Sequence, residues 1–249
     1  MKELLPVFSY NVRMNTIFFF SGTSGSGKST RIYYLVQYFE SLGLRTDEYS
    51  YRGRLIGRRY FDGSLLIIGK EVYRGNEKAW QGVDSYSDFL AGGEGHTGLY
   101  RFFFDTSKSM SLVLDSAILF RTNRSRPLYI ESQGVESDVY HRSYYYRSFE
   151  SYRQRIYDRT SGTRIPTQDS PMWNNNSDFP RYIQRFNEEL GSVEHPERFT
   201  IEHGDPEEPL YTIGDVVLRR VGRADLVDEF HVFCEKNPLG RKKIQGSLF

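Results

Sequence analysis

One segment near the start of the chain constrains the fold more than any other, namely 16-TIFFFSGTSGSGKSTRIYYLVQYF-39. The residues from Asn15 to Ser21 form a short apolar run that is typical of a buried strand and that leads into a glycine-rich turn. From Lys28 to Leu42 apolar residues recur at helical spacing, and Gly43 is a natural helix stop. The segment therefore predicts a strand, a tight loop and a helix in direct succession.

Further apolar runs alternate with helical patterns along the rest of the chain. The patterns predict strands at 44–51, 127–132 and 198–203, a strand pair at 54–73 around the turn Asp62-Gly63, and helices at 106–123, 179–190, 213–221 and 224–234. Residues 74–98 and 165–178 are expected to be loops, and residues 137–164 to be helical in part. This alternation predicts an α/β fold with a mostly parallel central sheet between two helix layers, plus a β-hairpin insertion.

The length of 249 residues fits one domain. Because Met14 lies just before the first strand, we expect residues 1–13 to be an extension and residues 14–249 to be a single domain. A lid or substrate-binding part is expected at about 137–178, and a basic tail at 240–249.

Composition narrows the classes of function. The formal net charge of +1 argues against a generally polybasic nucleic-acid binder, although it leaves room for a local basic patch. The single cysteine, Cys234, excludes an internal disulfide framework and a cysteine-based zinc cluster, so no disulfide-linked partner is expected. No run approaches the roughly 18 apolar residues of a membrane span. The start MKELLPVFSYNVR is a poor signal peptide, and we expect a cytoplasmic protein with no membrane partner.

The glycine-rich turn satisfies the pattern G-x-x-x-x-G-K-[ST], with a strand expected before it and a helix after it. Glycines let backbone N–H groups converge on phosphates, and the helix N-terminus favours an anion. Lys28 is expected to reach the β and γ phosphates as a catalytic group, and Ser29 to bind Mg²⁺. The expected nucleotide-binding residues are Gly22, Thr23, Ser24, Gly25, Ser26, Gly27, Lys28, Ser29 and Thr30. The expected cofactors are ATP or GTP and Mg²⁺.

On these residues the chain resembles the P-loop NTPase superfamily, and more narrowly its nucleoside, nucleotide and polynucleotide kinases. The resemblance implies a three-layer P-loop fold. A switch GTPase would need a base-specifying N-K-x-D motif, which is not found. A helicase or transport ATPase would normally show an apolar strand that ends in Asp-Glu, whereas the best candidate, Leu128 to Glu131, has a single acid. A kinase is therefore favoured over an NTPase that couples hydrolysis to a partner.

Three acidic residues are candidates for the acceptor side of a kinase site. Asp47 follows the first helix. Asp84 stands in 80-WQGVDSYSD-88, where an aromatic residue, a glycine and an acid in a long loop suggest the lip of a site. Glu131 ends a predicted buried strand, so it is the preferred second acid and a candidate Mg²⁺ residue.

The segment 140-YHRSYYYRSFESYRQRIYDRTSGTR-164 interleaves arginines with tyrosines. It is expected either to form a kinase lid that neutralises the transferring phosphoryl group, or to line a groove for nucleic acid. The alternative is an amphipathic helix whose tyrosines pack inward while its arginines are solvated. The substrate-binding candidates are Arg142, Arg147, Arg153, Arg155, Arg159 and Tyr145.

The order of these parts also resembles phage-encoded P-loop kinases, one group of which phosphorylates hydroxymethyluracil in DNA during thymine hypermodification. The blocks that carry this resemblance are IIGKEVY, WQGVDSYSD and YIESQGVESD. It implies a DNA substrate, with Lys28 and Ser29 as the phosphate and Mg²⁺ residues, and a host cytoplasmic location. The alternatives left open are a small-molecule nucleoside or nucleotide kinase and an ATPase subunit.

Overall fold

The computed structural model describes residues 14–23, 25–74, 77–116, 122–160 and 162–237. The predicted extension at 1–13, Ser24 of the glycine turn, the side chain of Arg159 and the tail at 240–249 lie outside these residues. The elements in chain order are β1 (Thr16–Gly22), α1 (Lys28–Ser41), β2 (Arg45–Tyr51), β3 (Arg54–Tyr60), β4 (Leu65–Ile68), β5 (Lys70–Arg74), β6 (Glu77–Gln81), α2 (Ser87–Ala91), α3 (Gly95–Ser107), β7 (Ser111–Ser116), α4 (Pro127–Ser132), β8 (Asp138–Tyr144), α5 (Phe149–Arg159), α6 (Pro171–Ser177), α7 (Phe179–Leu190), β9 (Phe199–Gly204), α8 (Thr212–Arg220) and α9 (Val227–Lys236).

Within the described part of the chain, seven strands form one sheet in the order β2-β3-β4-β7-β1-β8-β9, and β5 pairs with β6 separately. The strands β4, β7, β1, β8 and β9 are parallel, whereas β3 is antiparallel to both of its neighbours. The chain builds the sheet on the β7 side of β1 first and then crosses to the β8 side. In such sheets the crevice at the carboxyl ends of the strands on either side of this reversal is the usual ligand site.

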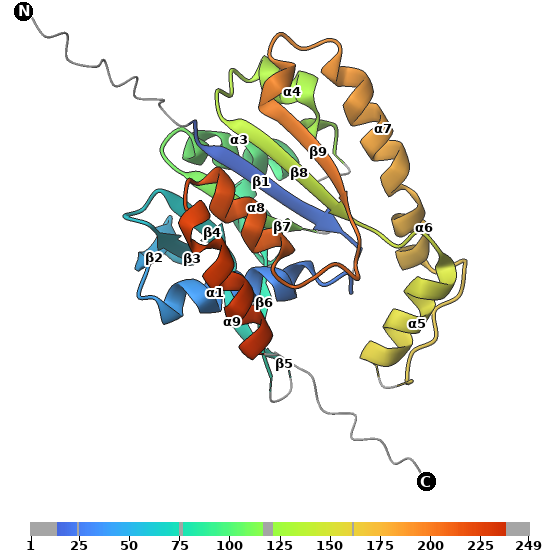
Figure 1. Cartoon of the computed structure of the whole chain (residues 1–249). Coiled ribbons are helices and arrows are strands. Elements are labelled where there is room, and N and C mark those ends of the chain that lie inside the picture. The colour runs from blue at the N-terminus through green and yellow to red at the C-terminus, as the bar shows by residue number, and fades with distance from the viewer. Residues whose placement is uncertain (1–13, 24, 75–76, 117–121, 161, 238–249) are drawn as a thin grey trace, which may run out of the picture.

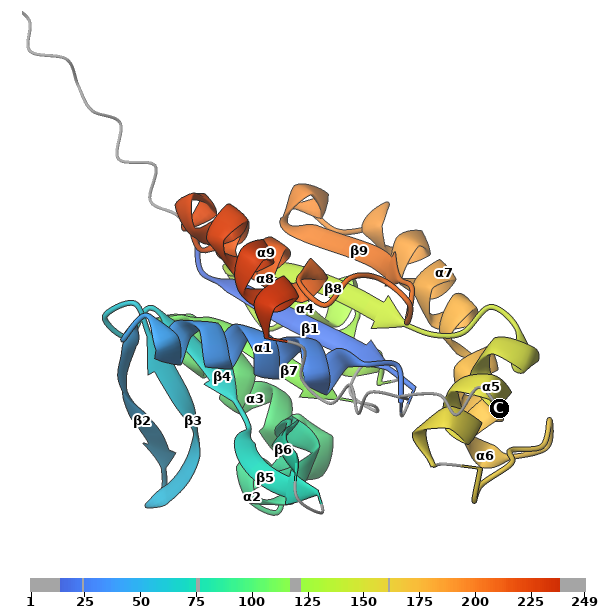
Figure 2. The ribbon, with the colours of Figure 1, turned by 60° about the horizontal axis from the view of Figure 1, so that its bottom comes forward.

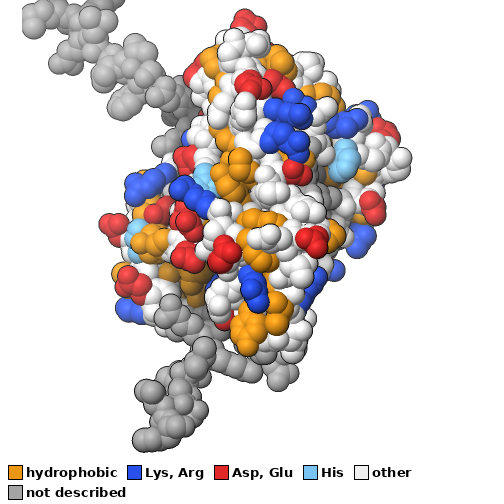
Figure 3. Space-filling view, turned by 90° about the vertical axis from the view of Figure 1, so that its right-hand side faces the viewer, with side chains coloured by type: hydrophobic (Ala, Val, Ile, Leu, Met, Phe, Trp, Pro, Cys, Tyr) orange, Lys and Arg blue, Asp and Glu red, His pale blue; other side chains and the backbone are white. Residues whose placement is uncertain are grey.

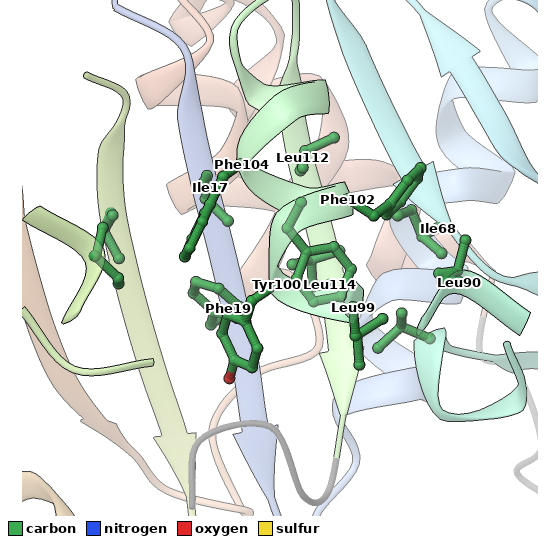
Figure 4. Packing of buried hydrophobic residues seen from close by; sticks show 14 of the residues in the cluster. Ile17, Phe19, Ile68, Leu90, Leu99, Tyr100, Phe102, Phe104, Leu112 and Leu114 are labelled. Atoms are coloured by element: carbon green, nitrogen blue, oxygen red, sulfur yellow. The ribbon is translucent and has the colours of Figure 1, made fainter. Parts of the chain in front are cut away.

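Helices cover both faces of the sheet, so the fold has three layers (Figures 1 and 2). Alternate residues of β1 point to opposite faces, as strand geometry requires. Phe18 and Phe20 pack with buried residues of α1, α8 and α9, whereas Ile17 and Phe19 pack with α3, α4 and α7. Figure 4 shows the second of these clusters, in which α3 lies against β1 and β7. The predicted α/β class with a mostly parallel sheet is confirmed.

Two predicted elements are wrong, and they matter for the site. The predicted helix at 106–123 contains the buried strand β7, while the preceding helix, α3, ends at Ser107. The predicted strand at 127–132 is the helix α4, with Pro127 in its first turn, where proline is well tolerated. Short apolar runs do not distinguish a strand from a buried helix by periodicity alone, which explains both errors.

Other boundaries differ in smaller ways. The loop predicted at 74–98 contains β6, α2 and the start of α3, and the loop predicted at 165–178 contains α6. In the segment 137–164 the helical part is α5, but its first residues form β8. The strand pair around Asp62-Gly63 is β3 and β4, which belong to the main sheet, so the additional hairpin is β5–β6 instead.

The remaining predicted elements are confirmed, and they include β1, α1, α7, β9, α8 and α9. Cys234 is a free, buried thiol. Among the described helices, none has the length and apolar character that a membrane crossing requires.

Candidate functional site

The residues 22–29, called the glycine loop below, connect β1 directly to α1. Gly25 and Gly27 have φ angles of 89° and 83°, in the left-handed region that favours glycine. Gly22 lies so close to β8 that an added Cβ would be 2.1 Å from the carbonyl oxygen of Tyr144. The loop is therefore tight because three of its positions need glycine.

The ammonium group of Lys28 lies inside the glycine loop. It donates to the carbonyl oxygens of Gly22, at 2.9 Å, and Thr23, at 3.3 Å, and to the hydroxyl of Ser26 at 3.4 Å. This positive charge is placed at the N-terminus of α1, where the helix dipole also favours anions. The loop thus combines a cation with a helix terminus at the carboxyl end of the central strand.

Ser29 and Asp115 connect the glycine loop to the neighbouring strand. The Ser29 hydroxyl donates to Oδ2 of Asp115, which is only 5% exposed on β7. A hydroxyl and a carboxylate are oxygen ligands of the kind that Mg²⁺ prefers. In the described ranges no three His, Cys, Asp or Glu side chains converge on one point. A Mg²⁺ ion here would therefore take its other ligands from phosphate oxygens and water, as is usual for this ion.

Asp84 approaches the same strand end from the segment that follows β6. The Ser116 hydroxyl donates to Oδ1 of Asp84 at 2.5 Å. Gly82 packs directly on Asp115, because an added Cβ would lie 2.4 Å from the Asp115 carbonyl oxygen. The structure therefore brings the predicted residues Lys28, Ser29 and Asp84 together, with Asp115 between them.

Asp115 was missed by the sequence reasoning, although a signal was present. The run 112-LVLD-115 is a short apolar segment that ends in an acid, as expected for a strand that delivers a carboxylate to the sheet edge. The assignment of this run to a helix hid that signal, and the role was given to Glu131 instead.

The structural argument for Glu131 is wrong. It lies on α4, and its Oε1 accepts the backbone N–H groups of Glu194 at 2.8 Å and His195 at 3.2 Å. This contact precedes the first residue of β9, and therefore lies at the amino ends of the parallel strands. The glycine loop follows the carboxyl end of β1, at the opposite edge of the sheet.

Asp47 is also remote from the glycine loop. It lies on β2, which three strands separate from β1, a distance of about 19 Å at normal strand spacing. Its carboxylate is paired with Arg59 on β3, and this hydrogen bond lowers the pKa of Asp47. Of the three predicted acids, only Asp84 lies near the glycine loop.

Arg142 is part of a largely buried ion network. It is on β8, its side chain is 12% exposed, and it pairs with Glu202 and, at 2.7 Å, with Glu208. Arg142 was predicted as a substrate-binding residue of a helical lid, whereas it lies on a strand of the central sheet with two carboxylate partners. Most tyrosines of the same segment are buried as well, which supports the packing alternative for Tyr140, Tyr144, Tyr146 and Tyr152.

Tyr145 and Arg147, by contrast, line a groove of about 360 Å³ beside α6. Arg153 and Arg155 are exposed on α5, and the backbone of Arg159 ends that helix. Figure 1 shows α5 and α6 beyond the arrowheads of β1 and β8, and Figure 3 shows the surface on this side, where hydrophobic side chains lie among Lys and Arg.

The segment 145–177 contacts the glycine loop directly. The Tyr146 hydroxyl donates to the Gly25 carbonyl oxygen at 3.1 Å, and the Thr23 hydroxyl donates to Oδ1 of Asn176 at 3.4 Å. Asn176 also bonds both the backbone N–H and the carbonyl of Tyr146, each at 2.7 Å. The segment that was predicted to form a lid is therefore attached to the glycine loop.

Arg31 is a second residue that the sequence reasoning missed. Its guanidinium is buried and donates to the carbonyl oxygens of Ser26 at 3.0 Å, Pro206 at 3.0 Å and Pro209 at 3.2 Å. Burial lowers the pKa of Arg31 from its usual value. The side chain ties the glycine loop to the segment that follows β9. Its partners Pro206 and Pro209 are too distant in sequence for a local pattern to indicate them.

A scan against protein-family models gave no match for this chain, and no curated protein matched it.

Proposed function

We propose that the protein is a Mg²⁺-dependent P-loop kinase, which transfers the γ-phosphoryl group of ATP or GTP to a hydroxyl group on a nucleotide or on DNA. The observation that carries this proposal is the arrangement of Ser29, Asp115 and Asp84 at the carboxyl ends of β1 and β7. It joins a cationic glycine loop, two oxygen ligands for a metal ion and an additional carboxylate within one edge of the sheet.

Each group has a role that fits its position. Lys28 and the loop N–H groups stabilise charge on the β and γ phosphates. Ser29 and Asp115 would hold Mg²⁺, which would supply positive charge next to the phosphates. The oxygen of the acceptor hydroxyl bonds to the γ-phosphorus, and the bond between that phosphorus and the oxygen bridging to the β-phosphate breaks. Asp84 accepts the proton that the hydroxyl loses. Ser116 holds the Asp84 carboxylate in place.

The residue after Asp115 favours transfer to a hydroxyl over hydrolysis. A motor ATPase normally has an Asp-Glu pair at this strand end, whereas this chain has Asp115 followed by Ser116. The second carboxylate, Asp84, comes instead from the separate segment after the β5–β6 hairpin. Asp84 therefore reaches this strand end from a different segment of the chain than Asp115 does.

The acceptor that we propose is a hydroxymethyl group on a base in DNA, with a free nucleoside or nucleotide as the alternative acceptor. The exposed Arg153 and Arg155 can bind backbone phosphates. The half-buried Tyr145 and the exposed Arg147 provide surfaces on which a base can stack.

The test is to incubate the protein with Mg²⁺ and γ-labelled ATP in the presence of duplex DNA with and without hydroxymethyluracil, a mixture of nucleosides, or water alone. Label in the hydroxymethyluracil DNA is the expected result. Label only in nucleosides would identify a small-molecule kinase, and release of phosphate as the sole product in every arm would contradict the proposal of a kinase. Lys28→Ala is the negative control.

A further inference from the structure

Tyr145 and Arg147, proposed above as stacking surfaces, belong to a larger groove between the end of β8 and α6. Its lining comes from three parts of the chain, and comprises Tyr145, Tyr146, Arg147, Trp173, Asn176, Ser177, Pro180 and His203. Its volume of about 360 Å³ lies within the range of small-molecule sites. Four of these residues carry flat aromatic rings and one carries a flat guanidinium group, so the lining is suited to a planar ligand.

The aromatic rings of the groove are supported from behind. The Tyr145 ring stacks parallel to Phe179, with 5.9 Å between the ring centroids, and lies 4.2 Å from the ring of His203. The Trp173 ring packs against Phe149 at 5.3 Å and Tyr152 at 5.5 Å. Tyr145 and Trp173 are both half-buried. Rings held in this way lose little conformational entropy when a ligand stacks on them.

Several polar groups of the groove already bond to the protein. The Arg147 guanidinium lies 3.1 Å from Nδ1 of His203 and can only donate, so Nδ1 is the acceptor. The ring proton is then on Nε2, which lies 3.4 Å from the Tyr145 carbonyl oxygen. The Ser177 hydroxyl donates to the Asn174 carbonyl oxygen. The groove therefore offers faces for stacking more than edges for reading hydrogen-bond patterns.

The groove borders the glycine loop through two shared side chains. Tyr146 and Asn176 line the groove, and the same two side chains bond Gly25 and Thr23. A ligand in the groove would therefore lie next to a phosphate chain held by the loop. Of the flat ligands that accompany phosphate, a nucleobase fits the lining best.

We propose, on the basis of the function proposed above, that this groove binds a nucleobase by stacking on Trp173, Tyr145 and the guanidinium of Arg147. The base belongs either to the nucleoside triphosphate or to the acceptor. Because stacking is tolerant of the base and few polar edges are offered, a triphosphate bound here is selected weakly, and we expect KM for ATP and GTP to agree within about tenfold.

Tryptophan fluorescence provides a direct readout, since the chain has two tryptophans and Trp80 is only 1% exposed. Trp80→Phe leaves Trp173 as the sole reporter. The ligands are inorganic tripolyphosphate, ATP, GTP and a short thymidine oligonucleotide. If Trp80→Phe does not fold, the same titrations of the wild type and of Trp173→Phe isolate the Trp173 signal.

Quenching by ATP and GTP but not by tripolyphosphate would assign the groove to the donor base. Quenching by the oligonucleotide but not by ATP would assign it to the acceptor base. If ATP raises Tm while no ligand with a base changes Trp173 fluorescence, the groove proposal is wrong and the kinase proposal stands. If neither tripolyphosphate nor ATP raises Tm, the kinase proposal itself has failed.

Kinetics give a second measurement. Trp173→Ala should raise KM for the ligand that occupies the groove by between about fivefold and a hundredfold, with kcat less affected, and Trp173→Phe should restore most of the loss. The matched control is Tyr157→Ala, an aromatic residue 45% exposed on α5 outside the groove lining. Equal losses of kcat in Trp173→Ala and Trp173→Phe, with KM unchanged, would assign Trp173 to lid packing alone and overturn the proposal.

Discussion

Gly82 holds the segment of Asp84 against β7, and Gly82→Ala tests that contact. The glycine has φ −79° and ψ −159°, which alanine adopts without strain. The added Cβ, however, would lie 2.4 Å from the Asp115 carbonyl oxygen and 2.7 Å from the Asp115 Cβ. To reach ordinary contact near 3.5 Å, the segment or the strand must move by about 1 Å.

That displacement has two expected costs. Overpacking of a buried contact destabilises by about 1–3 kcal/mol. At about 2–4 °C per kcal/mol for a chain of this size, Tm should fall by about 2–12 °C. Because Asp84 and Asp115 move relative to one another, the transfer rate should fall by about 100-fold, as misplacement by about 1 Å can produce.

The assay combines thermal unfolding with transfer of γ-labelled phosphate. Gly191→Ala is the matched control, because its Cβ would meet only the Glu188 carbonyl oxygen at 3.8 Å and its φ is −71°. The control should keep both Tm and activity. An unchanged Tm and an unchanged rate in Gly82→Ala would refute the contact between this segment and the end of β7.

Five further substitutions test other parts of the molecule. Lys28→Ala should remove most of the stabilisation by ATP and Mg²⁺, which for the wild type at 100 times Kd amounts to about 2.7 kcal/mol, and a retained Tm shift would place ATP elsewhere. Asp115→Asn should raise the Mg²⁺ concentration for half-maximal activity by about 10–100-fold, and an unchanged Mg²⁺ dependence would remove Asp115 from the metal site. Burial lowers the pKa of His141 to about 3, so the folded protein keeps this ring neutral. In the unfolded chain the ring takes up a proton below about pH 6.5. The free energy of unfolding therefore decreases as the pH falls from about 6.5 towards about 3. Between pH 7 and pH 5 the wild type should therefore lose about 2 kcal/mol more than His141→Phe in urea unfolding, and equal losses would contradict the burial. Arg142→Leu should destabilise by about 2–3 kcal/mol without changing the salt dependence of DNA binding, whereas Arg153→Ala should lower the salt slope at unchanged stability, and the reverse pattern would contradict these placements.

The sequence predicted best the elements whose pattern is long or has clear boundaries. β1 and α1 are separated by glycines whose positive φ angles favour glycine, and α7 has a helical repeat over its whole length. These elements were placed to within one or two residues, and they include the glycine loop. The α/β class followed from their alternation.

The sequence predicted least well the short elements between α3 and β8. The strand 111–116 and the helix 127–132 are both six-residue segments with apolar runs, and what decides each is the surface against which it packs. β7 fits between β4 and β1 and is buried on both faces, whereas α4 lies outside the sheet against α7. Because the strand was predicted at 127–132 instead of 111–116, Glu131 was chosen as the second acid in place of Asp115.

The arginines of the segment 140–164 show another limit. Arg142 finds its partners, Glu202 and Glu208, 60 and 66 residues further along the chain. No local pattern distinguishes it from Arg147, five residues later, which lines the groove. Composition indicated that the segment is distinctive, but only the tertiary pairing divides it into residues with a structural partner and residues that line the groove.

The central claim is that the glycine loop and the end of β7 together hold a metal-bound triphosphate. The most direct test is a crystal structure with Mn²⁺ and a non-hydrolysable ATP analogue, in which anomalous scattering locates the ion. We expect an ion on the Ser29 hydroxyl, with the Asp115 carboxylate bound to it directly or through one water, and triphosphate oxygens within the loop 22–29. An ion elsewhere, or a triphosphate bound away from Lys28, would contradict it.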